Sequence, residues 1–278
     1  MASHSERNDR RAPSAIGREN RSNPRKFNSF SKGGEDAKDW IWGVHAVEAA
    51  LSNPARPAAK RLLATPDRAK RLAPHAANLP QLQIMEGADI ARQLPQGAVH
   101  QGLALKIDPP EPLSIAELGT PAQGLIVMLD QITDPQNVGA IFRSAAAFGA
   151  RGAILQDRHA PVLSGVLAKT AVGAVDRVPY ARVVNLSRAL EELAELGWRA
   201  VGLSGDADET LEAVLDSRPT VLVLGSEGEG VRRLVAEHCD AMGKIAMPGG
   251  FDSLNVSAAA AVALYEASRV RPMEEFGS

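Results

Sequence analysis

The chain has 278 residues, which at roughly 150 residues per domain predicts about two domains. Hydrophobic residues make up 45% and charged residues 23%, the ordinary balance of a globular protein, and a single cysteine, Cys239, excludes an intrachain disulfide. No apolar run approaches the roughly 18 residues of a membrane-spanning helix. We therefore expect a cytoplasmic protein that does not cross a membrane.

The net charge of −2 is unlike that of a simple nucleic-acid binder, but the charge is unevenly distributed. Residues 1–38 hold nine Lys or Arg and five Asp or Glu, with almost no apolar periodicity. Such a segment buries too little apolar surface to offset the cost of ordering it, so we predict a disordered basic tail. A basic tail suits contact with a polyanion, although from charge alone a solubilising role is the simpler interpretation.

Residues 39–108 predict a small α/β domain. Strand patterns lie at 40–42, 61–64, 82–84 and 102–107, and helical patterns at 44–51 and from 66 to 72. A proline-rich stretch, residues 108–112, then stiffens the chain and blocks helix continuation. We accordingly place a linker at 109–119.

In residues 120–271 apolar strand patterns alternate with helical patterns, which predicts a second domain. We expect residues 272–278 to form a C-terminal tail. The strand patterns lie at 125–129, 153–155, 199–203, 221–224 and 244–247, and the helical ones at 186–196, 231–238 and 254–270. Several strands lack polar alternation, which is typical of strands covered on both faces. The pattern indicates a mostly parallel sheet with helices on both sides.

Ligands of open α/β sheets bind beyond the carboxyl ends of the strands, so the turns after the strands carry the functional signal. After strand 125–129, Asp134 and Pro135 predict a helix N-terminus. Asn137 and Arg143 follow, and Arg143 lies in a run of small and apolar residues where a guanidinium needs a polar partner. The alternative is an ion pair with a neighbouring carboxylate.

The turn after strand 221–224 is glycine-rich, Gly225-Ser226-Glu227-Gly228-Glu229-Gly230. It is neither a Walker loop nor a G-x-G-x-x-G fingerprint, and no such fingerprint follows the first strand, which argues against a nucleotide-dependent oxidoreductase. Its two carboxylates would repel a pyrophosphate. A cofactor without phosphate, carrying ribose hydroxyls or a positive centre, fits better, and a turn with solvated acids is the alternative.

The turn after strand 244–247 runs from Pro248 to Ser257 and leads into an alanine-rich helix. Asp252 or Ser253 would cap that helix, which leaves Asn255 and Ser257 in its first turns without an explanation. The small residues 258–261 permit close packing, including onto a partner subunit, or reflect helix propensity alone.

Taken together, the order Asn-x-Gly…Arg, Gly-Ser-Glu-Gly-x-Gly and Ser-Leu-Asn-Val-Ser resembles the SpoU (TrmH-type) branch of the SPOUT methyltransferases over residues 120–270. Residues 39–108 resemble the substrate-binding domain of the rRNA members, including the segments 43–47 and 99–102. The resemblance implies a SPOUT-type fold with a C-terminal trefoil knot, preceded by a small α/β domain of a ribosomal-protein type. It also implies a homodimer with its active sites at the interface.

The resemblance further implies transfer of a methyl group from S-adenosylmethionine to a ribose 2′-hydroxyl, with a guanosine of 23S rRNA as the expected target. The implied catalytic residues are Arg143, Asn137, Glu227, Ser253 and Asn255. The implied cofactor-binding residues are Gly225, Glu227, Ile245, Met247, Ser253 and Leu254. A guanidinium stays protonated in proteins, so we expect Arg143 to hold phosphate and stabilise the alkoxide.

Two alternatives remain open, a tRNA ribose 2′-O-methyltransferase and a non-catalytic RNA-binding assembly factor of the same fold. The intact Asn137, Arg143, Glu227 and Asn255 argue against the second. None of the six histidines falls in the three turns, and with one cysteine we expect no metal site.

Overall fold

The computed structural model describes residues 39–72, 81–250 and 253–271. The predicted basic tail, 1–38, and the predicted C-terminal tail, 272–278, lie outside the described residues. Among the described residues, no helix combines the length and the apolar character that crossing a membrane requires.

The N-terminal part of the described chain contains a four-stranded sheet of order β1-β4-β2-β3. β4 pairs antiparallel with β1 and β2, whereas β2 and β3 are parallel. The strands and their helices are β1 (Trp40–Trp42), α1 (Val44–Ser52), β2 (Arg61–Ala64), α2 (Pro66–Leu72), β3 (Leu82–Ile84), α3 (Gly87–Gln93) and β4 (Leu103–Lys106). The structure confirms the predicted strands and both predicted helices here, and it adds α3.

A six-stranded sheet of order β10-β8-β9-β5-β6-β7 forms the second part, and every neighbouring pair is parallel. Its strands are β5 (Leu125–Leu129), β6 (Gly152–Gln156), β7 (Tyr180–Val183), β8 (Arg199–Leu203), β9 (Thr220–Leu224) and β10 (Ala241–Gly243). The parallel sheet confirms the predicted fold class.

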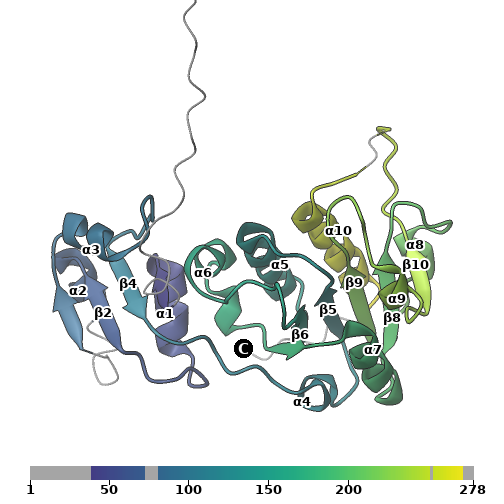
Figure 1. Cartoon of the computed structure of the whole chain (residues 1–278), viewed down its shortest axis with the longest axis horizontal. Coiled ribbons are helices and arrows are strands. Elements are labelled where there is room, and N and C mark those ends of the chain that lie inside the picture. The colour runs from purple at the N-terminus through teal and green to yellow at the C-terminus, as the bar shows by residue number, and fades with distance from the viewer. Residues whose placement is uncertain (1–38, 73–80, 251–252, 272–278) are drawn as a thin grey trace, which may run out of the picture. The chain divides into compact units, whose positions relative to one another are not determined.

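Helices cover both faces of this sheet (Figure 1). They are α4 (Ile115–Gly119), α5 (Pro135–Ala147), α6 (Gly165–Ala171), α7 (Leu186–Glu195), α8 (Leu211–Val214), α9 (Arg233–Ala236) and α10 (Val256–Arg269), with a 3-10 turn η2 (Ala174–Asp176).

The central strand β5 shows why its sequence lacks polar alternation. Leu125, Val127 and Leu129 pack into a core with side chains of α5, α6 and α10, whereas Ile126 and Met128 pack into a second core with α4 and α7. Successive side chains of a strand point to opposite faces, so both sets need apolar residues.

Three predicted boundaries are wrong. The strand expected at 244–247 is β10, Ala241–Gly243, and the apolar residues after it turn toward a cavity instead of pairing. The helix expected at 231–238 is the short α9. The last helix begins at Val256, because Asn255 is its N-cap, so a cap at Ser253 is wrong and Asp252 lies outside the described residues.

Candidate active site

A cavity of about 540 Å³ opens where β8, β9 and β10 end. These strands are neighbours in a parallel sheet, so the segments that follow them meet at one edge, the usual ligand site of such sheets. The lining residues come from four segments, namely residues 203–206, residues 224–231, Ile245 with Met247, and residues 253–256 with Ala259.

The glycine-rich loop after β9 folds back on itself. The backbone of Gly230 donates a hydrogen bond to the Ser226 carbonyl at 3.0 Å. A Cβ atom on Gly225 would lie 1.9 Å from the carbonyl carbon of Gly230, so residue 225 must be glycine for the loop to close. The sequence places glycine where backbone meets backbone at the wall of the cavity.

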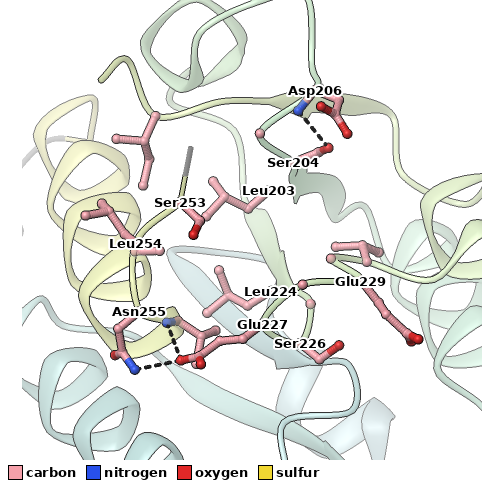
Figure 2. Close-up of a pocket in the computed structure, with 18 of the residues that line it drawn as sticks. Leu203, Ser204, Asp206, Leu224, Ser226, Glu227, Glu229, Ser253, Leu254 and Asn255 are labelled. Atoms are coloured by element: carbon pink, nitrogen blue, oxygen red, sulfur yellow. Dashed lines mark hydrogen bonds between the residues drawn. The ribbon is translucent and has the colours of Figure 1, made fainter. Parts of the chain in front are cut away.

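A network of polar side chains joins three strand-end segments. Asn255 Nδ2 donates to Glu227 Oε1 at 2.6 Å and to Asn137 Oδ1 at 3.1 Å. The backbone N–H of Val256 also donates to Glu227 Oε1, at 3.1 Å. Figure 2 shows Glu227 beside the first turn of α10. A carboxylate at a helix N-terminus accepts from a backbone N–H that has no partner within the helix, and it interacts favourably with the helix dipole.

Two helix caps fix this network. Asn255 Oδ1 accepts from the backbone N–H of Ser257 at 3.0 Å and so begins α10. Asp134 Oδ2 accepts from the backbone N–H of Asn137 at 2.9 Å, with Pro135 in the first turn of α5. The second cap confirms the helix start predicted from Asp134 and Pro135.

An ion pair holds the base of the glycine-rich loop, and sequence reasoning missed it. Asp130, at the end of β5, is fully buried and accepts from Arg232 Nε at 2.7 Å and from the Arg232 backbone N–H at 2.9 Å. A buried carboxylate needs such partners. The two residues are 102 positions apart, and no sequence spacing predicts that they form a pair.

The structure brings together most of the residues that the sequence singled out. The lining includes Gly225, Glu227, Ile245, Met247, Ser253, Leu254 and Asn255. Asn137 contacts the cavity through Asn255. Arg143 lies apart from them, exposed on α5 about 9 Å along the helix from Asn137, and it is outside the cavity lining of the described chain.

The wall formed by residues 203–206 was not predicted. Ser204 and Asp206 follow β8 in a polar turn, where the Asp206 backbone N–H donates to Ser204 Oγ at 3.3 Å. The strand-end rule that found the other turns would have found this one, since β8 was predicted with the correct bounds.

The segment that contains this site matches a known protein family. A model described as the SpoU rRNA Methylase family matches residues 124–265, which contain Asn137, the cavity lining and Arg143. The chain belongs to the SpoU rRNA methylase family. A second model, for the substrate-binding region of RNA 2′-O ribose methyltransferases, matches residues 40–113. The resemblance seen in the sequence is thereby confirmed.

Individual relatives agree. A relative named uncharacterized tRNA/rRNA methyltransferase, from Mycobacterium avium (strain 104), is 44% identical over 178 residues, 62% of this chain and 57% of that protein. The chain thus spans less than two thirds of that relative's length.

Two solved structures share the fold. The SpoU methyltransferase AviRb from Streptomyces viridochromogenes, in complex with the cofactor AdoMet, has a TM-score of 0.70 at 25% identity and covers 83% of this chain and 89% of its own. An AdoMet-bound rRNA methyltransferase from Sinorhizobium meliloti has a TM-score of 0.70 at 24% identity, with 83% of this chain and 86% of its own covered.

Within the described residues, no group of three or more His, Cys, Asp or Glu is arranged to hold a metal ion. The described cavity lining contains three carboxylates, Asp206, Glu227 and Glu229, and no lysine, arginine or histidine. A cofactor bound there meets negative charge and apolar surface, which disfavours a phosphate and favours a cation.

Proposed function

We propose that the protein transfers a methyl group from S-adenosylmethionine to a ribose 2′-hydroxyl of RNA. The observation that carries the proposal is the cavity at the ends of β8, β9 and β10, with Asn255 hydrogen-bonded to both Glu227 and Asn137 at its edge. Membership of the SpoU family and the cofactor bound to AviRb support the same reaction.

The residues of the cavity fit this cofactor. Leu203, Leu224 and Leu254 offer apolar surface to an adenine ring, and the closed backbone turn at Gly225 permits near approach to a ribose. The lining carboxylates suit a positive centre. Bound S-adenosylmethionine supplies an electrophilic methyl group on a sulfonium sulfur.

The roles of the protein residues follow from their placement. Ser253, Asn255 and Glu227 orient the cofactor and the reacting ribose at the mouth of the cavity, and positioning of this kind supplies much of the rate of such a displacement. Asn137 holds Asn255 in its rotamer. Arg143 binds the RNA phosphate and stabilises the developing alkoxide.

Arg143 acts on a cavity that it does not line, so the proposal includes a homodimer in which it approaches the cavity of a second copy. Val262 and Tyr265 are 38% and 49% exposed, which supports an apolar partner surface on α10, the helix whose first turns line the cavity. A C-terminal trefoil knot, with residues 120–271 as the catalytic domain, belongs to the same proposal.

For the substrate, we propose RNA held by residues 39–108, with a guanosine of 23S rRNA as the first candidate. The substrate-binding match at 40–113 supports RNA. The relatives' names include both tRNA and rRNA, so a tRNA target is the second candidate. The cytoplasmic location stays a prediction from the sequence.

The test is methyl transfer from labelled S-adenosylmethionine to ribosomal RNA and to tRNA, with Arg143→Ala and Arg143→Lys assayed across pH. We expect Arg143→Ala to lower kcat by about 10²- to 10³-fold. Arg188→Ala, an exposed arginine on α7, is the matched control and should keep full activity. Full activity of Arg143→Ala would remove Arg143 from catalysis, and no transfer by the folded wild type would overturn the function.

A further inference from the structure

In the function proposed so far, Asp206 on the cavity wall opposite the polar network has a role only as one of three lining carboxylates. Figure 2 shows Ser204 and Asp206 across the cavity from Glu227 and Asn255, with Leu203 and Leu224 between them. Asp206 is exposed and lines the cavity. Within the described residues, no hydrogen bond or ion pair engages its carboxylate, and only its backbone N–H is bound, to Ser204.

The carboxylates of the lining differ in what already neutralises them. Glu227 accepts from Asn255 and from the first N–H of α10, so its charge is partly offset by protein groups. Asp206 has no such donors among the described residues, nor has Glu229 on the glycine-rich loop, so the charge of each acts on whatever fills the cavity. No basic side chain lines the described cavity to cancel it.

We propose that Asp206 is a specificity-determining residue, whose charge makes the site prefer a sulfonium cofactor over the neutral thioether product. The inference rests on the proposed function. When the ribose oxygen bonds to the methyl carbon, the C–S electron pair stays on sulfur and the 2′-hydroxyl proton leaves to water. The molecule left in the cavity has lost one positive charge, so its attraction to Asp206 falls and its release is favoured.

Comparing cofactor and product isolates this effect. S-adenosylmethionine and S-adenosylhomocysteine carry the same ammonium and carboxylate and differ only by the methyl group and the charge on sulfur. The ratio of their affinities therefore reports the electrostatic environment of the sulfur. A solvent-exposed charge pair is worth up to about 1 kcal/mol, which corresponds to about a two- to fivefold change in that ratio.

The experiment is calorimetric titration of the full chain with three probes, S-adenosylmethionine, S-adenosylhomocysteine and sinefungin, an analogue with a protonated amine at the sulfonium position. The variants are Asp206→Asn, Asp206→Glu and Asp208→Asn. Asp208 is also exposed and lies two residues further, outside the cavity lining, so Asp208→Asn makes the same change in net charge.

We expect Asp206→Asn to lower the affinity for S-adenosylmethionine and for sinefungin about two- to fivefold. The affinity for S-adenosylhomocysteine should change less than about twofold. Asp206→Glu and Asp208→Asn should keep the wild-type ratio, and raising the salt should lower that ratio in the wild type. Equal weakening of all three probes, or an unchanged ratio in Asp206→Asn, would overturn the inference alone. Failure of folded wild-type protein to bind any probe would overturn the proposed function with it.

Discussion

Glu227 Oε1 lies 2.6 Å from Asn255 Nδ2, although the two residues are 28 positions apart in the chain. One residue belongs to the loop after β9 and the other begins α10. The contact makes the start of the last helix part of the cavity wall.

Asn255→Ala tests this double role. The variant loses the cap of α10 and the bonds to Glu227 and Asn137, so we expect a loss of about 1–2 kcal/mol in unfolding free energy and at least tenfold weaker binding of S-adenosylmethionine. Urea denaturation and calorimetry measure the two effects. Asn185→Ala, which removes the cap of α7, should cost similar stability and leave binding intact. Equal binding losses in both variants would contradict the role of the network.

Gly225→Ala tests the closed backbone turn. The added Cβ would meet Gly230 backbone at 1.9 Å, so the loop must open and the cavity lose its shape. We expect binding of S-adenosylmethionine to fall below detection in calorimetry, with helix content in circular dichroism retained. Gly249→Ala is the control, because a Cβ there meets nothing within 4 Å. Wild-type affinity in Gly225→Ala would show that the turn is dispensable.

Arg232→Ala tests the buried ion pair. It leaves the fully buried Asp130 without its charge partner, which we expect to cost about 3 kcal/mol in urea denaturation. The neighbouring Arg233 pairs with Glu237 at the surface, where its side chain is 78% exposed, so Arg233→Ala should cost less than about 0.5 kcal/mol. Similar losses in the two variants would argue against a special role of the Asp130 pair.

The single cysteine offers a test of local burial. Burial in the packed region after α9 raises the pKa of the Cys239 thiol to about 12, so almost no thiolate exists at pH 8. We expect a disulfide reagent to react with the native protein at least a hundredfold more slowly than with the urea-unfolded chain. The native state holds this proton more tightly, so stability should fall as pH rises above about 8.5. Rapid reaction of folded protein at pH 8 would be the contrary result.

Much of the fold was predictable because its signals are local. The apolar run of β5 spans five residues, and Asp134 with Pro135 marks the start of α5. Each signal could be read from neighbouring residues, and together such signals gave the alternation of strands with helices. β10 was misplaced because three residues give too short a pattern, and the more apolar Ile245 and Met247 beside it face the cavity.

The site was predictable to the extent that its residues cluster after strands. Glu227 and Asn255 stood out in their turns, but their hydrogen bond depends on the order of strands in the sheet. The pair of Asp130 and Arg232 and the wall at Asp206 also depend on that order. The position of a residue after a strand therefore predicted that it belongs to the site, whereas the order of strands in the sheet decided which of these residues are in contact.

The cap of α10 has a consequence for how the protein becomes functional during synthesis. Asn255 and the helix it starts leave the ribosome after β5, β8 and β9 have been made, and α10 then packs into the core beside α5. A nascent or clipped chain that stops before residue 255 has the glycine-rich loop but lacks Asn255, Val256 and Ala259, which line the same cavity. We therefore expect a chain without α10 to bind the proposed cofactor more weakly than the chain in which α10 has docked.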